Sequence, residues 1–136
     1  MNQITVNADV NQVRTVTDFV NGHLEPLGCS ERIRIQVDVA IDEIFSNISR
    51  YAYNPETGQA TVRVEVQEEP LSVIITFIDH GKPFDPLARE LPDVTRLPKG
   101  ERPVGGLGLF MVKKTMDDIS YTYKDGQNIL TIRKRI

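Results

Sequence analysis

The sequence predicts an α+β fold in two layers, with a mixed, mostly antiparallel sheet of about five strands and about three helices on one face. Two observations lead to this prediction. Apolar residues recur at helical spacing in the first part of the chain, and alternating or continuously apolar runs typical of strands follow. The 136 residues are enough for one domain with a real core and too few for two. We therefore expect a single domain over residues 1–136.

The first elements are a short strand and two helices. Residues 3–6 alternate and suggest an opening strand. A helix is expected from Asp9, as a possible N-cap, to about Leu24. A longer helix is expected from Ser30 to Tyr51, where the residues YNPETG end its apolar stripe.

Four further strands follow. Residues 59–69 alternate strictly, and residues 71–79 form a more continuously apolar run. The last two strands, at 119–124 and 128–136, are joined by a tight turn at Asp-Gly-Gln. Residues 80–106 lie between the two strand pairs and are rich in proline, glycine and charged residues. A structureless segment of this length in a small domain is usually functional or disordered.

Composition excludes several classes of protein. The formal net charge of −3 gives no support to an electrostatic partnership with nucleic acid or a membrane, and we expect neither. Cys29 is the single cysteine, which rules out an internal disulfide and fits a reducing compartment. The first residues have neither a basic nor a strongly apolar region of the kind found in signal peptides, so a cytoplasmic location is expected.

The second predicted helix carries a carboxylate and an amide, Glu43 and Asn47, four residues apart. At this spacing both side chains project from one helix face. They flank the apolar stripe, so both can point into a cleft at the edge of the sheet. Oxygen ligands of this kind suit Mg²⁺, and a carboxylate beside a phosphate can act as a general base. A solvated surface pair is the alternative, and these two residues alone do not decide between the two interpretations.

Asp79 stands at the end of the most apolar strand, and Gly81 follows it closely. An Asp at that point can accept hydrogen bonds from an exocyclic amine or from water. The glycine allows another surface to approach the backbone. An ordinary turn is the alternative. A zinc site is not expected, because His80 has only His23 as a possible imidazole partner and there is no Cys pair.

Three glycines, Gly105, Gly106 and Gly108, stand where a helix over residues 107–118 is predicted to begin. Glycine inside a helix costs roughly 1 kcal/mol relative to alanine, so the cluster calls for an explanation. One is a loop with positive φ angles or a close packing contact. The other is that backbone N–H groups are exposed to bind an anion, most often phosphate. The common phosphate-binding motifs are absent, so a nucleotide site would need another architecture.

The order of these three clusters resembles the GHKL superfamily of ATPases, and most closely the bacterial anti-sigma-factor serine protein kinases, which have a histidine-kinase-like ATPase domain. The matching segments are Glu43, Asn47 and Ala52-Tyr53 for the N-box, residues 79–86 for the Asp-x-Gly-x-x-Phe-Asp box, and residues 105–117 for the last box. The resemblance covers nearly all of the chain. It implies the Bergerat-type ATPase fold.

The resemblance also implies that the matched residues bind ATP and Mg²⁺. Asn47 would coordinate Mg²⁺, and Glu43 would be the general base and a second metal ligand, directly or through water. Asp79 would bind the adenine amine. The other residues implied to contact the nucleotide are Gly81, Phe84, Gly105, Gly106, Leu107, Gly108, Thr131 in the last strand and Arg14 on the first helix. Residues 86–104 would be a lid that orders over bound ATP.

Two features depart from the family pattern. The spacing from Arg14 to Glu43 is about three residues longer than usual, which puts the role of Arg14 in doubt. Tyr51 stands where close relatives often have His, so that corner of the pocket is expected to differ in shape.

The function implied is that of a serine protein kinase that phosphorylates an anti-sigma-factor antagonist and sequesters a sigma factor, as a homodimer. A different class is a non-catalytic, ATP-responsive module that regulates a partner protein without phosphoryl transfer. A third interpretation is the ATPase part of a sensor histidine kinase. It is disfavoured because the sequence shows neither dimerisation helices nor a phospho-acceptor His.

Overall fold

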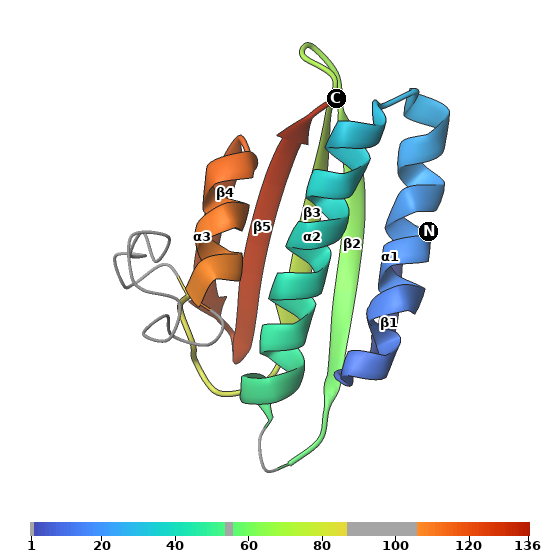
Figure 1. Ribbon diagram of the computed structural model, residues 1–136. Helices are drawn as coiled ribbons and strands as arrows, with labels where there is room; N and C mark the ends of the chain where they lie inside the picture. Colours follow the sequence, from blue (N-terminus) through green and yellow to red (C-terminus); the bar gives the residue numbers. More distant parts are fainter. Residues whose placement is uncertain (1, 54–55, 87–105) are drawn as a thin grey trace.

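The computed structural model describes residues 2–53, 56–86 and 106–136, which form a sheet with helices on one of its faces (Figure 1). Along the chain the main elements are β1 (Gln3–Asn7), α1 (Val13–Leu24), α2 (Glu31–Asn47), β2 (Gln59–Gln67), β3 (Ser72–Asp79), α3 (Gly106–Thr115), β4 (Asp118–Lys124) and β5 (Gln127–Arg135). The predicted α+β class is confirmed.

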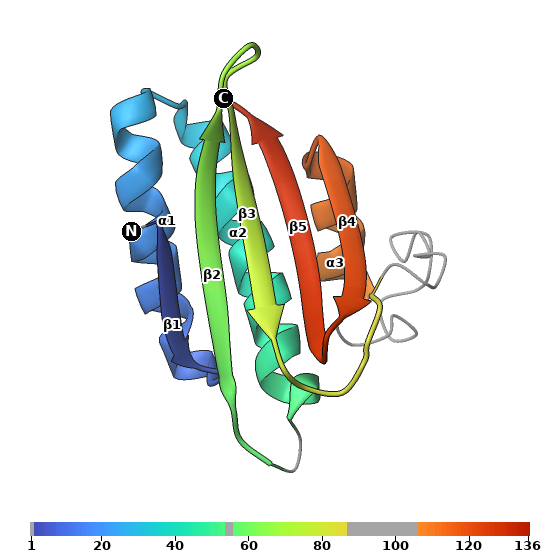
Figure 2. The same ribbon diagram turned by 180° about the vertical axis from the view of Figure 1, so that it is seen from behind.

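The five strands lie in the order β1-β2-β3-β5-β4. Figure 2 shows this sheet from the side that the helices leave uncovered. Every pairing between these strands is antiparallel, whereas we expected a mixed sheet. The reason is that two hairpins, β2-β3 and β4-β5, join through β3 and β5, and this central pairing is itself antiparallel. It places Asp79 at the end of β3 opposite Asn128 near the start of β5.

The hairpin between β4 and β5 turns at two residues with positive φ. Asp125 has φ 54° and Gly126 has φ 76°. This pair of values is typical of the tight turns that match the twist of antiparallel strands, and Asp-Gly is a preferred sequence for them. The turn predicted here is therefore confirmed.

One helix end agrees with the prediction and two differ from it. Ser30 caps α2, because its Oγ accepts a hydrogen bond from the backbone N of Ile33 at 3.2 Å. Asp9 caps a short 3₁₀ turn, Val10–Gln12, and α1 itself begins after that turn. At its other end α2 stops at Asn47 and continues as a π-helical turn, Ile48–Ala52. Such wide turns are often found at functional sites.

The core lies between the helices and the inner face of the sheet. Its fully buried members include Val16, Val20 and Leu24 from α1, Val37, Ile41 and Phe45 from α2, and Val62, Val64, Ile75, Phe77 and Ile132 from the strands. Because side chains alternate along a strand, Val73, Ile75, Phe77 and Asp79 of β3 all face the helices. Asp79 therefore continues the line of the core side chains toward the end of the sheet.

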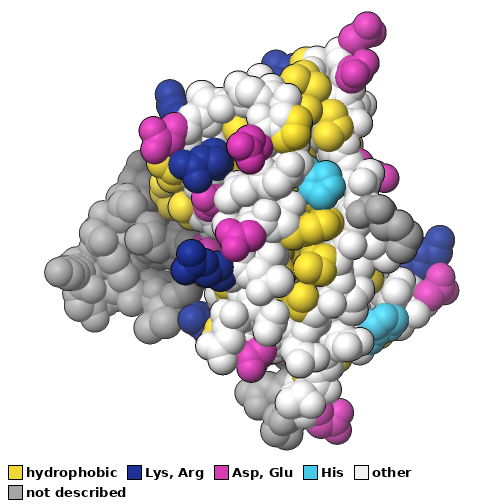
Figure 3. Space-filling model, turned by 90° about the vertical axis from the view of Figure 1, so that its right-hand side faces the viewer, with side chains coloured by type: hydrophobic (Ala, Val, Ile, Leu, Met, Phe, Trp, Pro, Cys, Tyr) yellow, Lys and Arg dark blue, Asp and Glu magenta, His cyan; other side chains and the backbone are white. Residues whose placement is uncertain are grey.

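The side of the molecule formed by α1 and β1 carries acidic and basic side chains in a scattered arrangement, with hydrophobic side chains between them (Figure 3). In the part of the chain that the structure describes, none of the helices combines the length and hydropathy needed to cross a membrane.

Candidate functional site

A pocket lies between the C-terminal end of α2 and strands β3, β5 and β4. Ile44, Ile48, Phe77, Leu109 and Leu130 supply apolar parts of its wall, and its polar side chains include those of Asn47, Asp79, Tyr121 and Asn128. Two of the three clusters found in the sequence thus meet here, because Asn47 and Asp79 line the same pocket. A mainly apolar pocket with a few convergent polar groups is the usual form of a small-molecule site.

Asp79 is the most deeply placed acidic group of this pocket, with 4% of its surface exposed. Its Oδ1 accepts two hydrogen bonds, from the backbone N of Gly81 and from Nδ2 of Asn128, each at 2.9 Å. Among the residues that the structure describes, no donor lies on its Oδ2. A ligand that brings an N–H group to this oxygen would therefore gain a well-oriented acceptor.

Glu43 and Asn47 behave differently, although they lie one helical turn apart on α2. Asn47 lines the pocket, whereas Glu43 is half-buried and is not among the lining residues. Burial raises the pKa of the Glu43 carboxyl, nearby Asp42 raises it further, and Arg50 opposes the shift. A carboxyl group with a raised pKa is suited to accept a proton near neutral pH.

The structure gives Gly81 a different reason from the one predicted. A Cβ at Gly81 would lie 2.2 Å from the backbone O of Ala52 and 2.6 Å from its Cβ. The next residue, Lys82, donates its backbone N–H to the same Ala52 oxygen at 2.9 Å. The close approach at Gly81 is therefore made by the π-helical turn after α2, and Gly81 is not among the pocket-lining residues. That Gly81 also contacts the nucleotide stays a prediction.

The side chain of Tyr53 also stabilises this contact between the π-helical turn and the segment after β3. Its hydroxyl accepts a hydrogen bond from the backbone N of His80 at 2.8 Å and donates one to the backbone O of Gln59 at 2.6 Å. The end of α2, the start of β2 and the segment after β3 are thus tied together. The floor of the pocket at Asp79 is built on this junction.

Two exposed aromatic rings lie at the pocket. Phe84 is 45% exposed and Tyr51 is 51% exposed, and both line it. Their ring centroids are 6.0 Å apart with an interplanar angle of 30°. Tyr51, which departs from the family pattern, therefore lies against Phe84, a predicted site residue. The two rings offer an apolar surface to a ligand.

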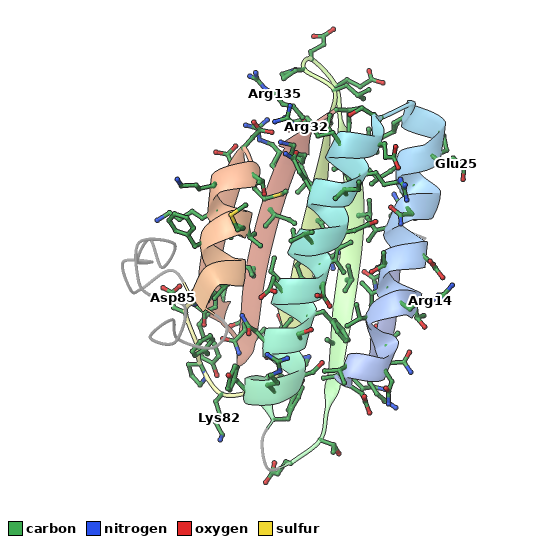
Figure 4. All side chains as sticks on the ribbon, viewed as in Figure 1. Arg14, Glu25, Arg32, Lys82, Asp85 and Arg135 are labelled. Carbon is green, nitrogen blue, oxygen red and sulfur yellow. The ribbon has the colours of Figure 1, made fainter. Side chains whose placement is uncertain are left out.

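Besides Glu43 and Gly81, two further predicted site residues do not line the pocket. Thr131 lies on β5 between Leu130 and Ile132, which are buried under the helices, so its side chain is on the opposite face of the sheet. Arg14 is an exposed residue of α1, and α2 lies between α1 and α3. Its side chain points away from α2 (Figure 4).

Sequence reasoning missed Asn128, which occupies the place that Thr131 was expected to take. Asn128 is 6% exposed, faces the helices and contacts Asp79 directly. Tyr121 of β4 was also missed, and its hydroxyl donates to Oδ1 of Asn128. The signal for Asn128 was its even spacing from Leu130 and Ile132, which puts all three on one face of the strand.

The glycine cluster is described in part. Gly106 and Gly108 lie in the first turn of α3, whose Leu109 lines the pocket. The first backbone N–H groups of a helix have no partner within it, so this end of α3 can bind an anion. Gly105 and residues 87–104 of the predicted lid lie outside the described residues, and so does the side chain of Leu107.

Comparison with known proteins places the chain in a family. Residues 6–134 match the histidine kinase-like ATPase domain, and the chain belongs to this family. The resemblance seen in the motifs is therefore confirmed.

Two curated relatives are protein kinases by name. Serine-protein kinase RsbW from Bacillus cereus (strain ATCC 10987 / NRS 248) is 32% identical over 95 residues, which cover 68% of this chain and 58% of RsbW. Serine/threonine-protein kinase BtrW from Bordetella bronchiseptica is 29% identical over 103 residues, which cover 76% of this chain and 71% of BtrW. The match to the first of these relatives thus spans 58% of its length.

Solved structures share the fold. The structure of the RsbU and RsbW domains of Rv1364c from Mycobacterium tuberculosis has a TM-score of 0.65 at 18% identity, covering 99% of this chain and 32% of that chain. The Acinetobacter baumannii histidine kinase AdeS has a TM-score of 0.57 at 14% identity, covering 97% of this chain and 67% of that one. At these identities the likeness concerns the fold alone.

Proposed function

We propose that the protein is an ATP-binding anti-sigma regulatory factor, a cytoplasmic serine protein kinase that phosphorylates an anti-sigma-factor antagonist and sequesters a sigma factor. The observation that supports ATP binding is Oδ2 of Asp79, which accepts no hydrogen bond from the described residues and belongs to an apolar pocket that Asn47 also lines. The names of the two kinase relatives support phosphoryl transfer. The two protein partners and a homodimer follow from the family resemblance of the motifs.

The residues of the pocket fit an adenine nucleotide. Asp79 would accept a hydrogen bond from the exocyclic amine of the base, while Phe77 and Leu130 would pack on the ring. The rings of Tyr51 and Phe84 would flank it. The N-terminal turn of α3 would present backbone N–H groups to the phosphates.

The same residues fit Mg²⁺ as the partner of the phosphates. Asn47 brings an amide oxygen to the pocket, and Glu43 would assist through water. In the described ranges no three His, Cys, Asp or Glu side chains gather as a metal cluster. A site with few protein ligands is typical of Mg²⁺ in phosphoryl transfer, where water and phosphate oxygens complete the coordination. The ion would neutralise charge on the phosphates.

Glu43 would accept the proton of the substrate serine hydroxyl. Its raised pKa makes it a better base than an ordinary surface carboxylate. In phosphoryl transfer most of the rate comes from positioning and charge neutralisation, so the contribution of Glu43 adds to that of Asn47 and α3.

One observation favours a second function. Glu43 is not among the residues that line the pocket. If it stays there when nucleotide is bound, the protein would be an ATP-responsive module that regulates a partner without transferring phosphate.

The test is a transfer assay with labelled ATP and antagonist candidates encoded near this gene. Glu43→Gln keeps size and hydrogen bonding but removes the basicity. Glu31→Gln is the matched control, because Glu31 lies at the other end of α2, is exposed and is not a pocket-lining residue. We expect phosphoserine with the parent protein and the control, and a loss of roughly 10²–10⁴-fold in Glu43→Gln with ATP binding retained.

Two results would contradict this proposal in different ways. If the parent binds ATP and sigma factor but phosphorylates no candidate, the non-catalytic module is correct. If Glu43→Gln transfers phosphate at the parental rate, Glu43 is not the base.

A further inference from the structure

We propose that Asn128 is the positioning residue that gives the pocket its selectivity for adenine over guanine. It would do so by fixing which oxygen of Asp79 faces the ligand. This inference deepens the proposed function and rests on it, because it assumes that a purine nucleotide occupies the pocket.

The orientation of the Asn128 amide is set by two backbone groups that cannot exchange roles. Nδ2 donates to the backbone O of Lys82 at 2.8 Å, and Oδ1 accepts from the backbone N of Phe84 at 3.1 Å. A carbonyl can only accept and an N–H can only donate. If the amide were turned over, both contacts would become repulsive. Nδ2 is therefore held on the side of Asp79.

This orientation fixes Asp79 in turn. Its Oδ1 receives Nδ2 of Asn128 and the backbone N–H of Gly81, each at 2.9 Å. Two donors on one oxygen hold the carboxylate plane and leave Oδ2 as the acceptor without a partner among the described residues. Adenine presents an N–H donor at its six-position, whereas guanine presents a carbonyl oxygen there. Two acceptors facing each other in a buried site disfavour guanine by on the order of 10–100-fold.

Tyr121 completes the arrangement from the neighbouring strand. Its hydroxyl donates to Oδ1 of Asn128, beside the N–H of Phe84. Burial raises the pKa of this phenol, so it stays a donor throughout the neutral range. The amide oxygen of Asn128 thus receives two donors, as does Oδ1 of Asp79. In the series Tyr121, Asn128 and Asp79, each hydrogen bond therefore has a fixed donor and a fixed acceptor.

The experiment measures the binding of Mg·ATP and Mg·GTP to the full chain by calorimetry. The variants are Asn128→Ala, which removes the amide, and Tyr121→Phe, which removes one hydroxyl and keeps the ring. Gln127→Ala is the matched control, because Gln127 is the neighbouring residue of β5 and its side chain is on the opposite face. Circular dichroism spectra check that each variant is folded.

We expect the parent and Gln127→Ala to prefer ATP by on the order of 10–100-fold. In Asn128→Ala the ratio of ATP to GTP affinity should fall by at least tenfold. In Tyr121→Phe it should fall by roughly 3–10-fold, since one neutral hydrogen bond that supports the amide is lost. A merely structural role would weaken both nucleotides alike and leave the ratio unchanged.

The possible failures can be told apart. If the parent binds neither nucleotide, the proposed function and this inference both fall. If the parent prefers ATP but Asn128→Ala keeps the same ratio, the inference alone is overturned. If Asn128→Ala does not fold, an unchanged ratio in Tyr121→Phe overturns it as well.

Discussion

Replacing Gly81 with alanine tests the junction beneath the pocket most directly. The added Cβ would lie 2.2 Å from the Ala52 carbonyl oxygen and 2.5 Å from the Ala52 carbonyl carbon. Carbon atoms pack best at about 3.5–4.0 Å, so one of the two backbone segments must move by roughly 1 Å. That movement would stretch the bond from the Lys82 N–H to the Ala52 oxygen, which is 2.9 Å long.

The cost has two parts. Overpacking of this kind costs about 1–3 kcal/mol, and loss of one backbone hydrogen bond costs about 1 kcal/mol. We therefore expect Gly81→Ala to lower the free energy of unfolding by about 2–4 kcal/mol. With a urea m-value of about 2 kcal/mol/M, the unfolding midpoint should fall by about 1–2 M.

The assay is urea unfolding followed by circular dichroism, with Gly22→Ala as the control. Gly22 lies in α1 and an added Cβ would meet no atom within 4 Å. Alanine there should stabilise the protein by about 0.5–1 kcal/mol, because it is the better helix former. The same chemical change should thus have opposite signs at the two positions. A Gly81→Ala variant within about 0.5 kcal/mol of the parent would refute the contact with Ala52, since that is the range of surface substitutions.

Further predictions concern charge and metal. Asn21 and Asp38 each keep a buried oxygen without a partner in the described part of the chain, and burial raises the pKa of Asp38. Stability is then highest while Asp38 is protonated and falls as pH rises through its raised pKa. Asp38→Asn should abolish this fall and gain about 1 kcal/mol at pH 7 in urea unfolding, and an unchanged pH profile would count against it. Asn47→Ala should weaken Mg·ATP far more than adenosine in calorimetry, and equal losses would remove Asn47 from the metal site. Because burial raises the pKa of Glu43, phosphoryl transfer should decline on acidification at a higher pH than an ordinary glutamate would cause, and the Glu43→Gln variant should lack this limb.

The order of helices and strands could be read from the sequence because it depends on local periodicity. The caps at Ser30 and the Asp125-Gly126 turn were visible for the same reason. The π-helical turn after Asn47 was not, since apolar spacing does not distinguish it from a continuing α-helix.

Asn47 and Asp79 could be predicted as site residues because each belongs to a short motif that is visible in the sequence. A site residue could not be predicted where its contacts depend on the pairing of β3 with β5. Asn128 and Asp79 are 49 residues apart, and their contact follows from strand register alone. The same register puts Thr131 on the outer face. Gly81 was identified from the sequence, but its close contact with Ala52, which leaves no room for a side chain, is not shown by any local pattern.

The central pairing of β3 with β5 has a consequence for folding. This pairing joins two parts of the chain within the sheet. The strands β1, β2 and β3 precede residue 80, whereas α3, β4 and β5 follow residue 105. Pairing between segments so distant in sequence slows folding, because the entropy of closing the intervening loop must be lost first. Asp79 and Asn128 lie on opposite sides of this pairing, so the pocket comes into existence only when the two parts dock. A ligand in the pocket would contact both parts of the chain, so nucleotide binding would stabilise the folded protein as a whole.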